Sequence, residues 1–318
     1  MPTPGGSAAR QHTTPDLDRL PFAFTAEHPG ERRRVNTLSR LLVGGGLGVG
    51  PTVADIVPAP GRRLLARGWA RALVAAADLT LDITGLDNID PAQSYLVAPL
   101  HESFVDVPVL LHLPLDLRFT VRDELIDHPQ LGSLLARTGQ ISVPERPSVA
   151  TLRGLMDEVS QAIAGGESVV VFPQGSILGV EAAFSPGVVT MSRRLGLPIL
   201  PIVLTGTHRV WGHPFSNVVR LGQTAAMHIL EPVPGGELDG ASFRDFERTM
   251  KRRALAQTEA PVRRFDPVVD GWWDGYAYTI DPDFPELVAA VAAHRNATDQ
   301  LDPEILGLGQ ETGENLSK

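Results

Sequence analysis

Residues 94–106 read SYLVAPLHESFVD, an apolar run that ends in a polar loop. The run up to Pro99 has the continuous hydrophobicity of a strand that is buried on both faces. His101 follows it closely, and Asp106 comes five residues later, at the predicted start of a helix over 106–112. Open α/β sheets carry their active sites in loops at the carboxyl ends of strands. The stretch therefore predicts a buried central strand and a candidate His–Asp dyad.

Strand-like and helix-like segments alternate on both sides of this stretch. We expect strands at 79–84, 118–121, 140–143, 168–172, 199–204 and 227–230, and helices at 60–77, 130–137, 149–164, 187–195 and 242–257. Such alternation indicates an α/β fold in which helices flank a central, mostly parallel sheet on both faces. An amphipathic helical segment precedes this core.

The composition excludes several classes of protein. The chain has 318 residues, 43% hydrophobic and 20% charged, which is typical of a folded globular protein. The net charge of −9 argues against a nucleic-acid partner, which favours a basic surface. Because cysteine is absent, disulfides, thiolate metal ligands and a cysteine nucleophile are excluded. His208 and His213 lie close together but have no zinc-type spacing around them, so we predict no metal site.

The composition also predicts four parts along the chain. Residues 1–30 are expected to be a disordered lead-in rather than a secretory signal. Residues 31–78 form a basic, amphipathic helical segment that contacts a membrane, and residues 79–260 form the catalytic domain. Residues 261–318 are a C-terminal extension whose end, from residue 297, is expected to be mobile.

The membrane prediction rests on charge and on one apolar run. Residues 31–72 hold eight arginines against Glu31 and Asp55, a net charge of +6. A basic, apolar segment on an acidic body is typical of contact with an anionic membrane surface, although a solvated helix face explains the same charge. The uncharged run 41–54 is too short to span a bilayer, and its glycines and Pro51 predict an interrupted helix. We therefore expect a cytoplasmic protein that associates peripherally with the inner face of the membrane.

Three further blocks follow the His–Asp loop in order. The first runs from VRDEL at 121–125 to GQISV at 139–143, the second is FPQGS at 172–176, and the third is GLPILPI at 196–202. The ordered set resembles the glycerolipid acyltransferase family, typified by lysophosphatidic acid acyltransferase, over about residues 80–207. The resemblance implies a fold like that of glycerol-3-phosphate acyltransferase.

It also implies a reaction. A fatty acyl group passes from an acyl-CoA or acyl carrier protein thioester to a hydroxyl of a lysophospholipid-type acceptor in phospholipid biosynthesis, with no bound cofactor. His101 is the implied general base and Asp106 its partner. Ser103 matches a serine common in the family, but we expect it to cap a helix. The residues implied to bind substrate are Arg122, Gly139, Arg146, Phe172, Pro173, Gln174, Gly175, Ser176 and Pro201.

The departures from the family pattern concern the acceptor. Gln174 stands where the family has glutamate, Ile177 stands where it has arginine, and Arg146 falls one residue late. Because such arginines suit a phosphate, an acceptor without phosphate is an open alternative: a glycolipid, an amino-acid lipid or a secondary metabolite. A catalytically silent relative that binds acyl chains or membranes, and a thioesterase that uses water, also stay open.

Overall fold

The computed structural model describes residues 24–26, 28–144, 149–175, 184–211, 218–234 and 236–255. Most of the predicted lead-in and all of the predicted C-terminal extension lie outside these residues. Two predicted site residues, Arg146 and Ser176, lie outside them as well.

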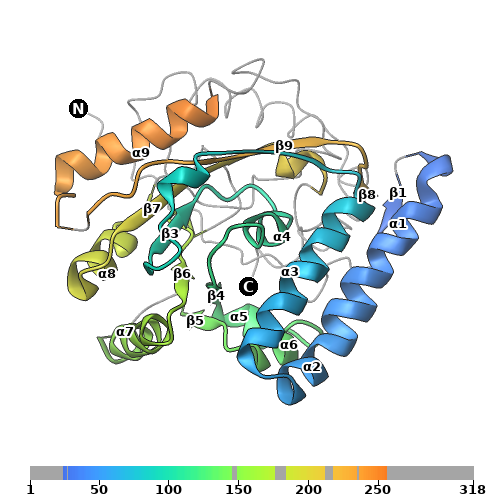
Figure 1. Ribbon diagram of the computed structural model, residues 1–318, viewed down its shortest axis with the longest axis horizontal. Coiled ribbons are helices and arrows are strands. Elements are labelled where there is room, and N and C mark those ends of the chain that lie inside the picture. Colours follow the sequence, from blue (N-terminus) through green and yellow to red (C-terminus); the bar gives the residue numbers. More distant parts are fainter. Residues whose placement is uncertain are drawn as a thin grey trace, which may run out of the picture.

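A seven-stranded sheet forms the centre of the molecule, with the strand order β2-β9-β7-β3-β6-β4-β5 (Figure 1). Its strands are β2 (Thr80–Thr84), β3 (Leu96–Pro99), β4 (Leu117–Arg122), β5 (Ile141–Val143), β6 (Ser168–Val170), β7 (Ile199–Thr205) and β9 (Thr224–Ile229). The five strands from β7 to β5 are parallel, whereas β9 is antiparallel to β7 and carries β2 beside it in parallel. The predicted mostly parallel sheet is confirmed. A separate two-stranded sheet pairs β1 (Thr25–Ala26) with β8 (Val218–Val219).

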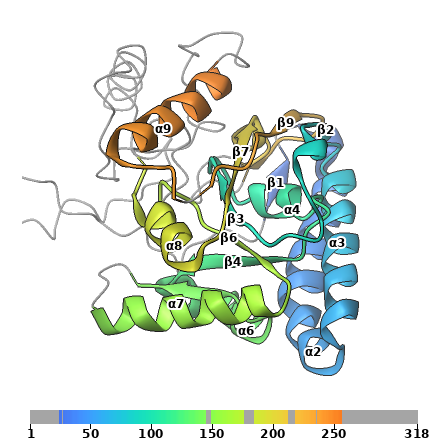
Figure 2. The same ribbon diagram turned by 60° about the vertical axis from the view of Figure 1, so that its left-hand side comes forward.

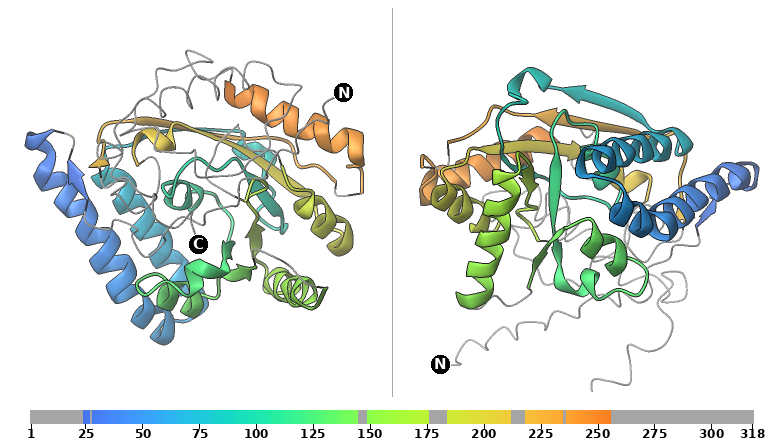
Figure 3. Two further views of the ribbon diagram at one scale, coloured as in Figure 1. Left: turned by 180° about the vertical axis from the view of Figure 1, so that it is seen from behind. Right: turned by 60° about the horizontal axis from the view of Figure 1, so that its bottom comes forward.

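Helices cover both faces of this sheet, as predicted. They are α1 (Arg32–Ser39), α2 (Gly50–Ile56), α3 (Ala59–Ala76), α4 (Asp106–Leu110), α5 (Asp123–Ile126), α6 (Gly132–Arg137), α7 (Val149–Ala164), α8 (Gly187–Leu195) and α9 (Gly240–Leu255). Figures 2 and 3 show α7, α8 and α9 on the side of the sheet away from α3. The bounds of α7 and α8 coincide with the predicted helices, and α1 lies within the helical segment predicted over 31–78, whereas α5 and the small sheet were not predicted.

Period-two alternation along the buried strands divides the core into two clusters. In β3, Val97 packs with α1, α3 and α4, while Leu96 and Ala98 pack with α7, α8 and α9. In β7, Leu200 belongs to the first cluster and Ile199 to the second. Successive side chains of a strand point to opposite faces, so a continuous apolar run indicates a sheet that is covered twice.

The expected loss of regular α-helix over 41–54 is confirmed for Arg40–Val49, although the chain stays helical there. Residues Arg40–Val49 continue α1 as a π-helical segment, and α2 follows it directly. A Cβ at Gly46 would lie 2.9 Å from the Trp69 ring of α3, so the glycine lets the two helices approach. Pro51 stands in the first turn of α2, directly after the π-helical segment. Residues 32–76 thus form a helical hairpin, defined here as α1, the π-helical segment, α2 and α3.

Candidate active site

The His–Asp dyad predicted from the sequence is assembled at the carboxyl end of β3. The Nδ1 atom of His101 lies 2.7 Å from Oδ2 of Asp106, the first residue of α4. The Asp106 side chain is fully buried, while His101 keeps 13% of its side chain exposed and lines the main cavity. The bond through Nδ1 leaves Nε2 for a proton that comes from the cavity.

Hydrogen-bond donors surround the Asp106 carboxylate. Besides the imidazole, Oδ2 accepts the backbone N–H groups of Glu102 at 2.7 Å and Ser103 at 3.0 Å. The other oxygen, Oδ1, accepts the hydroxyl of Thr207 at 2.5 Å. Hydrogen bonds to the charged form favour it, so these donors offset the cost of burying an ionised carboxylate. The donors thus reach both oxygens of the carboxylate beside the imidazole.

The loop after β6 braces the histidine from a second direction. The Phe172 ring stacks on the His101 ring with centroids 3.9 Å apart and an angle of 23° between the planes. The Gln174 side chain accepts the backbone N–H of His101 through Oε1 at 3.1 Å. An amide and a carboxylate both supply such an acceptor, so the glutamine that replaces the family glutamate keeps this contact between the loops.

Ser103 caps the turn that leads into α4, as expected: its hydroxyl accepts the N–H of Val105 at 3.1 Å, and its carbonyl accepts the N–H of Asp106 at 3.1 Å. The same hydroxyl donates to the carbonyl of Trp211 at 2.5 Å. The fully buried serine therefore ties the dyad loop to the segment after β7.

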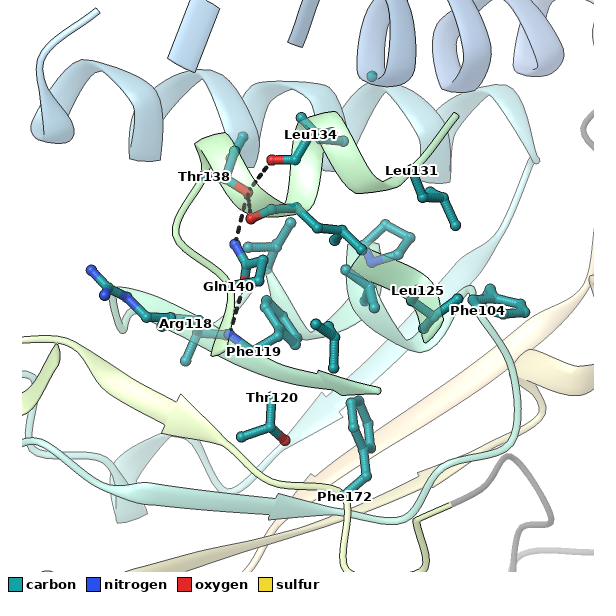
Figure 4. A pocket seen from close by; sticks show the side chains of 18 of the residues that line it. Phe104, Arg118, Phe119, Thr120, Leu125, Leu131, Leu134, Thr138, Gln140 and Phe172 are labelled. Atoms are coloured by element: carbon teal, nitrogen blue, oxygen red, sulfur yellow. Dashed lines mark hydrogen bonds between the residues drawn. The ribbon is translucent and has the colours of Figure 1, made fainter. Parts of the chain in front are cut away.

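A mostly apolar cavity of about 1170 Å³ opens beside His101. Figure 4 shows part of its wall, where the side chains of Phe119, Leu125 and Phe172 gather from β4, α5 and the loop after β6. Trp69 of the helical hairpin lines the cavity from the other side. Such a wall suits an acyl chain, because hydrocarbon gains free energy when it leaves water.

Arg122 ends β4 and lines the same cavity. Its guanidinium binds Glu124 through two parallel hydrogen bonds of 2.9 and 2.8 Å. The Arg122 hydrogen bonds hold the pKa of Glu124 below its usual range, so the pair is ionised at neutral pH. In the sheet, β6 lies between β3 and β4, so β4 is two strands away from β3. Because neighbouring strands lie about 4.8 Å apart, the Arg122–Glu124 pair lies about 10 Å from β3, at the carboxyl edge of the sheet that also carries the dyad.

The other predicted substrate-binding residues are divided between the cavity and the framework. Pro173 and Gly175 line the cavity, and Gly175 has a φ of +66° that suits its place in the turn. Gly139 precedes β5 at the amino edge of the sheet, and Pro201 pairs with Ala98 inside the sheet. These two support the fold and are not among the residues that line the cavity.

Sequence reasoning missed the loop that follows β7. The Oε2 atom of Glu102 accepts the N–H of Gly206 at 2.9 Å and lies 2.8 Å from Nδ1 of His208. With the Thr207 bond to Asp106, three successive residues of this loop contact the dyad loop. His208 was considered from the sequence only as a metal ligand. The sequence signal for this loop is Gly206-Thr207-His208, which directly follows the buried strand β7; β7 is parallel to β3, so both strands end at the same edge.

Comparison with known proteins identifies what the chain is similar to. The family model described as Acyltransferase matches residues 80–205. A 1-acyl-sn-glycerol-3-phosphate acyltransferase of Brassica napus, BAT2, is 27% identical over 164 residues, 50% of this chain and 46% of its own length. A lyso-ornithine lipid O-acyltransferase of Pseudomonas aeruginosa is 26% identical over 228 residues, 66% of this chain and 84% of its own length. The chain thus spans about half of the plant relative and most of the bacterial one.

A solved structure shares the fold. The 1-acyl-sn-glycerophosphate acyltransferase PlsC of Thermotoga maritima superimposes with a TM-score of 0.57 at 16% sequence identity, over 72% of this chain and 96% of that chain. The family match assigns residues 80–205 to the class of acyltransferase domains. Together with relatives that are named as glycerolipid O-acyltransferases, it supports placing this domain in the glycerolipid acyltransferase family.

Proposed function

We propose that this protein transfers a fatty acyl group from an acyl-CoA or acyl carrier protein thioester to the free hydroxyl of a lysophospholipid-type lipid. His101 Nε2 takes the proton of that hydroxyl as its oxygen attacks the thioester carbonyl carbon. The C–S bond then breaks, and the leaving thiolate takes the proton back from the imidazolium. The buried Asp106 anion stabilises the imidazolium between these two steps.

The contact between His101 and Asp106 at the mouth of an apolar cavity carries this proposal. Gln174 is the main support for a catalytically silent protein, yet it keeps its hydrogen bond to the His101 backbone. The buried donors around Asp106 also support an enzyme, because fully satisfying a buried carboxylate beside a histidine serves proton transfer.

The assay for the proposal follows thiol release from palmitoyl-CoA by the full chain, with and without lysophosphatidate. Release that requires the acceptor supports acyl transfer. Release at the same rate without it identifies a thioesterase instead. If palmitoyl-CoA is inert, palmitoyl-acyl carrier protein replaces it, and failure of both donors with every acceptor named below contradicts the proposal.

Peripheral membrane contact is part of the proposed function, because the acceptor is a lipid. Among the described residues, no helix is both long and apolar enough to cross a membrane. The turn between α2 and α3 forms one end of the helical hairpin (Figure 1). Near this turn, four large apolar side chains are exposed at 51–73% of their area: Val49, Ile56, Leu64 and Leu65. Such a patch, beside Arg62 and Arg63 at the start of α3, suits an anionic membrane surface.

Replacing both Ile56 and Leu64 by serine is therefore expected to weaken binding to anionic phospholipid vesicles by roughly tenfold or more, since each buried apolar side chain contributes about 1.5–3 kcal/mol. These are the two most exposed of the four, and neither lines the cavity. Vesicle sedimentation measures the effect. Leu86→Ser, which is 45% exposed beyond β2, is the matched control. An equal loss in the control, or no loss in the double variant, contradicts the placement of the contact.

An amino-acid lipid is the second candidate acceptor, and the Arg122–Glu124 pair favours it. A guanidinium that is already paired in bidentate fashion is less suited to grip a lone phosphate. A headgroup with both an ammonium and a carboxylate matches the two charges of the pair. The bacterial relative named as a lyso-ornithine lipid O-acyltransferase is aligned over a larger share of this chain than the plant relative.

Glu124→Gln separates these two acceptors. The amide removes the charge that competes for Arg122, so kcat/KM with lysophosphatidate is expected to rise by about 3- to 10-fold relative to that with lyso-ornithine lipid, since a charge-assisted bond contributes about 1.5–3 kcal/mol and only part is recovered. Asp123→Asn, the neighbouring carboxylate, is the control. An unchanged ratio of the two kcat/KM values places the headgroup away from this pair.

A further inference from the structure

Residues 206–208, directly after β7, contact the dyad loop and are not among the residues that line the cavity. Thr207 is fully buried, as is Asp106, and its hydroxyl lies 2.5 Å from Oδ1. The other three donors to this carboxylate, the His101 ring and two backbone N–H groups, all bind Oδ2. Among the described residues, Thr207 is thus the donor that holds the second oxygen and fixes the rotation of the carboxylate about its Cβ–Cγ bond.

The backbone holds Thr207 in place with little freedom. Gly206 has a φ of +87°, and a Cβ on it would lie 2.5 Å from the carbonyl oxygen of Thr224 in β9. The chain can therefore turn here only with glycine, directly before the threonine. Glu102 adds two contacts on either side of Thr207, one to the N–H of Gly206 and one to the ring of His208.

We infer that Thr207 is a positioning residue for the proposed acyl transfer, acting through Asp106, and that Gly206 and the Glu102–His208 contact hold it there. A carboxylate fixed at both oxygens keeps the imidazole in the tautomer that carries its proton on Nδ1. Without the hydroxyl, Oδ1 is a buried acceptor with no donor, and the carboxylate is free to turn away from the imidazole. Nε2 is then unprotonated, and able to act as base, in only part of the molecules.

This inference rests on the proposed function, and a double-mutant cycle tests it by acyl transfer from palmitoyl-CoA. Thr207→Val is expected to lower kcat by about 10- to 100-fold, the range for a lost hydrogen bond to a buried charge, with little change in either KM. Thr207→Ser keeps the hydroxyl and should restore kcat to within about threefold of the wild type. In an Asp106→Asn background, Thr207→Val should lower kcat by less than about threefold, since residues that act through one another are not additive.

A second readout needs no substrate. The ring ¹⁵N shifts of His101, assigned by their loss in His101→Gln, report the tautomer of the full-length protein. We expect Nδ1 protonated in the wild type and in Thr207→Ser, and a mixture of tautomers in Thr207→Val. If Thr207→Val does not fold, the wild type still provides a test: the buried Thr207 hydroxyl should give a slowly exchanging proton resonance.

The possible failures are distinguishable. Acyl transfer that persists in His101→Ala overturns the proposed function. In that case the ¹⁵N tautomer measurement still tests whether Thr207 positions the dyad. If His101 is required but Thr207→Val keeps the wild-type kcat and tautomer, the positioning role is overturned. An equal loss of kcat with and without the Asp106 carboxylate, or a fast-exchanging Thr207 hydroxyl, overturns it as well.

Discussion

His101→Ala is expected to lower the rate of acceptor-dependent thiol release by about 10²- to 10⁴-fold, the contribution of a general base that is removed entirely. The His101 ring bonds Asp106 through Nδ1, and the residue lines the cavity in which the substrates are proposed to bind. KM for palmitoyl-CoA should change little, because the apolar wall that suits the chain is untouched. Thiol release under saturating donor and acceptor measures kcat directly.

The control for this variant is another histidine close by. His112 lies just beyond α4, and its Nδ1 atom is 2.8 Å from the carbonyl of Pro108. His112→Ala should retain the rate within about threefold, since it removes an imidazole that the proposed transfer does not use. A His101→Ala enzyme that turns over at a similar rate would remove this histidine from the mechanism.

Asp106→Asn is expected to cost about 10²- to 10⁴-fold in kcat, by analogy with the loss when the acid of a catalytic triad becomes an amide. The amide has one acceptor oxygen, whereas donors approach both oxygens of Asp106. Its NH₂ group conflicts with the N–H donors at the Oδ2 position and fits at the Oδ1 position only if the Thr207 hydroxyl turns to accept from it; in both orientations the charge that stabilises the imidazolium is gone. Losing the charge-assisted hydrogen bonds of the buried carboxylate should lower the free energy of unfolding by about 1–3 kcal/mol.

Steady-state kinetics and urea unfolding together check this prediction. Asp87→Asn, an exposed carboxylate after β2, is the matched control and should change neither quantity measurably. We expect the Asp106→Asn protein to be folded at 25 °C but nearly inactive. Full activity with an intact fold would mean that the imidazole does not depend on an anionic partner, and would also remove the basis for a role of Thr207.

Local pattern predicted the framework well, because the signals are local. Continuous apolar runs marked the buried strands, and the helical period over 149–164 and 187–195 gave α7 and α8 with their observed bounds. The glycines at 41–54 predicted the loss of regular α-helix, but composition could not show that the segment stays helical. Trp69, more than twenty residues later, packs against Gly46 and offsets the intrinsic cost of glycine in a helix.

The order of the motifs along the chain was enough to place His101 and Asp106 together, since five residues at a strand end bring the two side chains into one loop. It could not show that Thr207 holds the second oxygen of Asp106, because that contact joins residues 101 positions apart. Nor could it show that Glu124 already occupies Arg122, since the choice of partner depends on how β4 meets α5. The chain alone determines the residue types and their local hydrophobic periods. The parallel pairing of β3 with β7 arises only in the tertiary structure, and this pairing brings the loops after the two strands, which are distant in sequence, to the same carboxyl edge of the sheet.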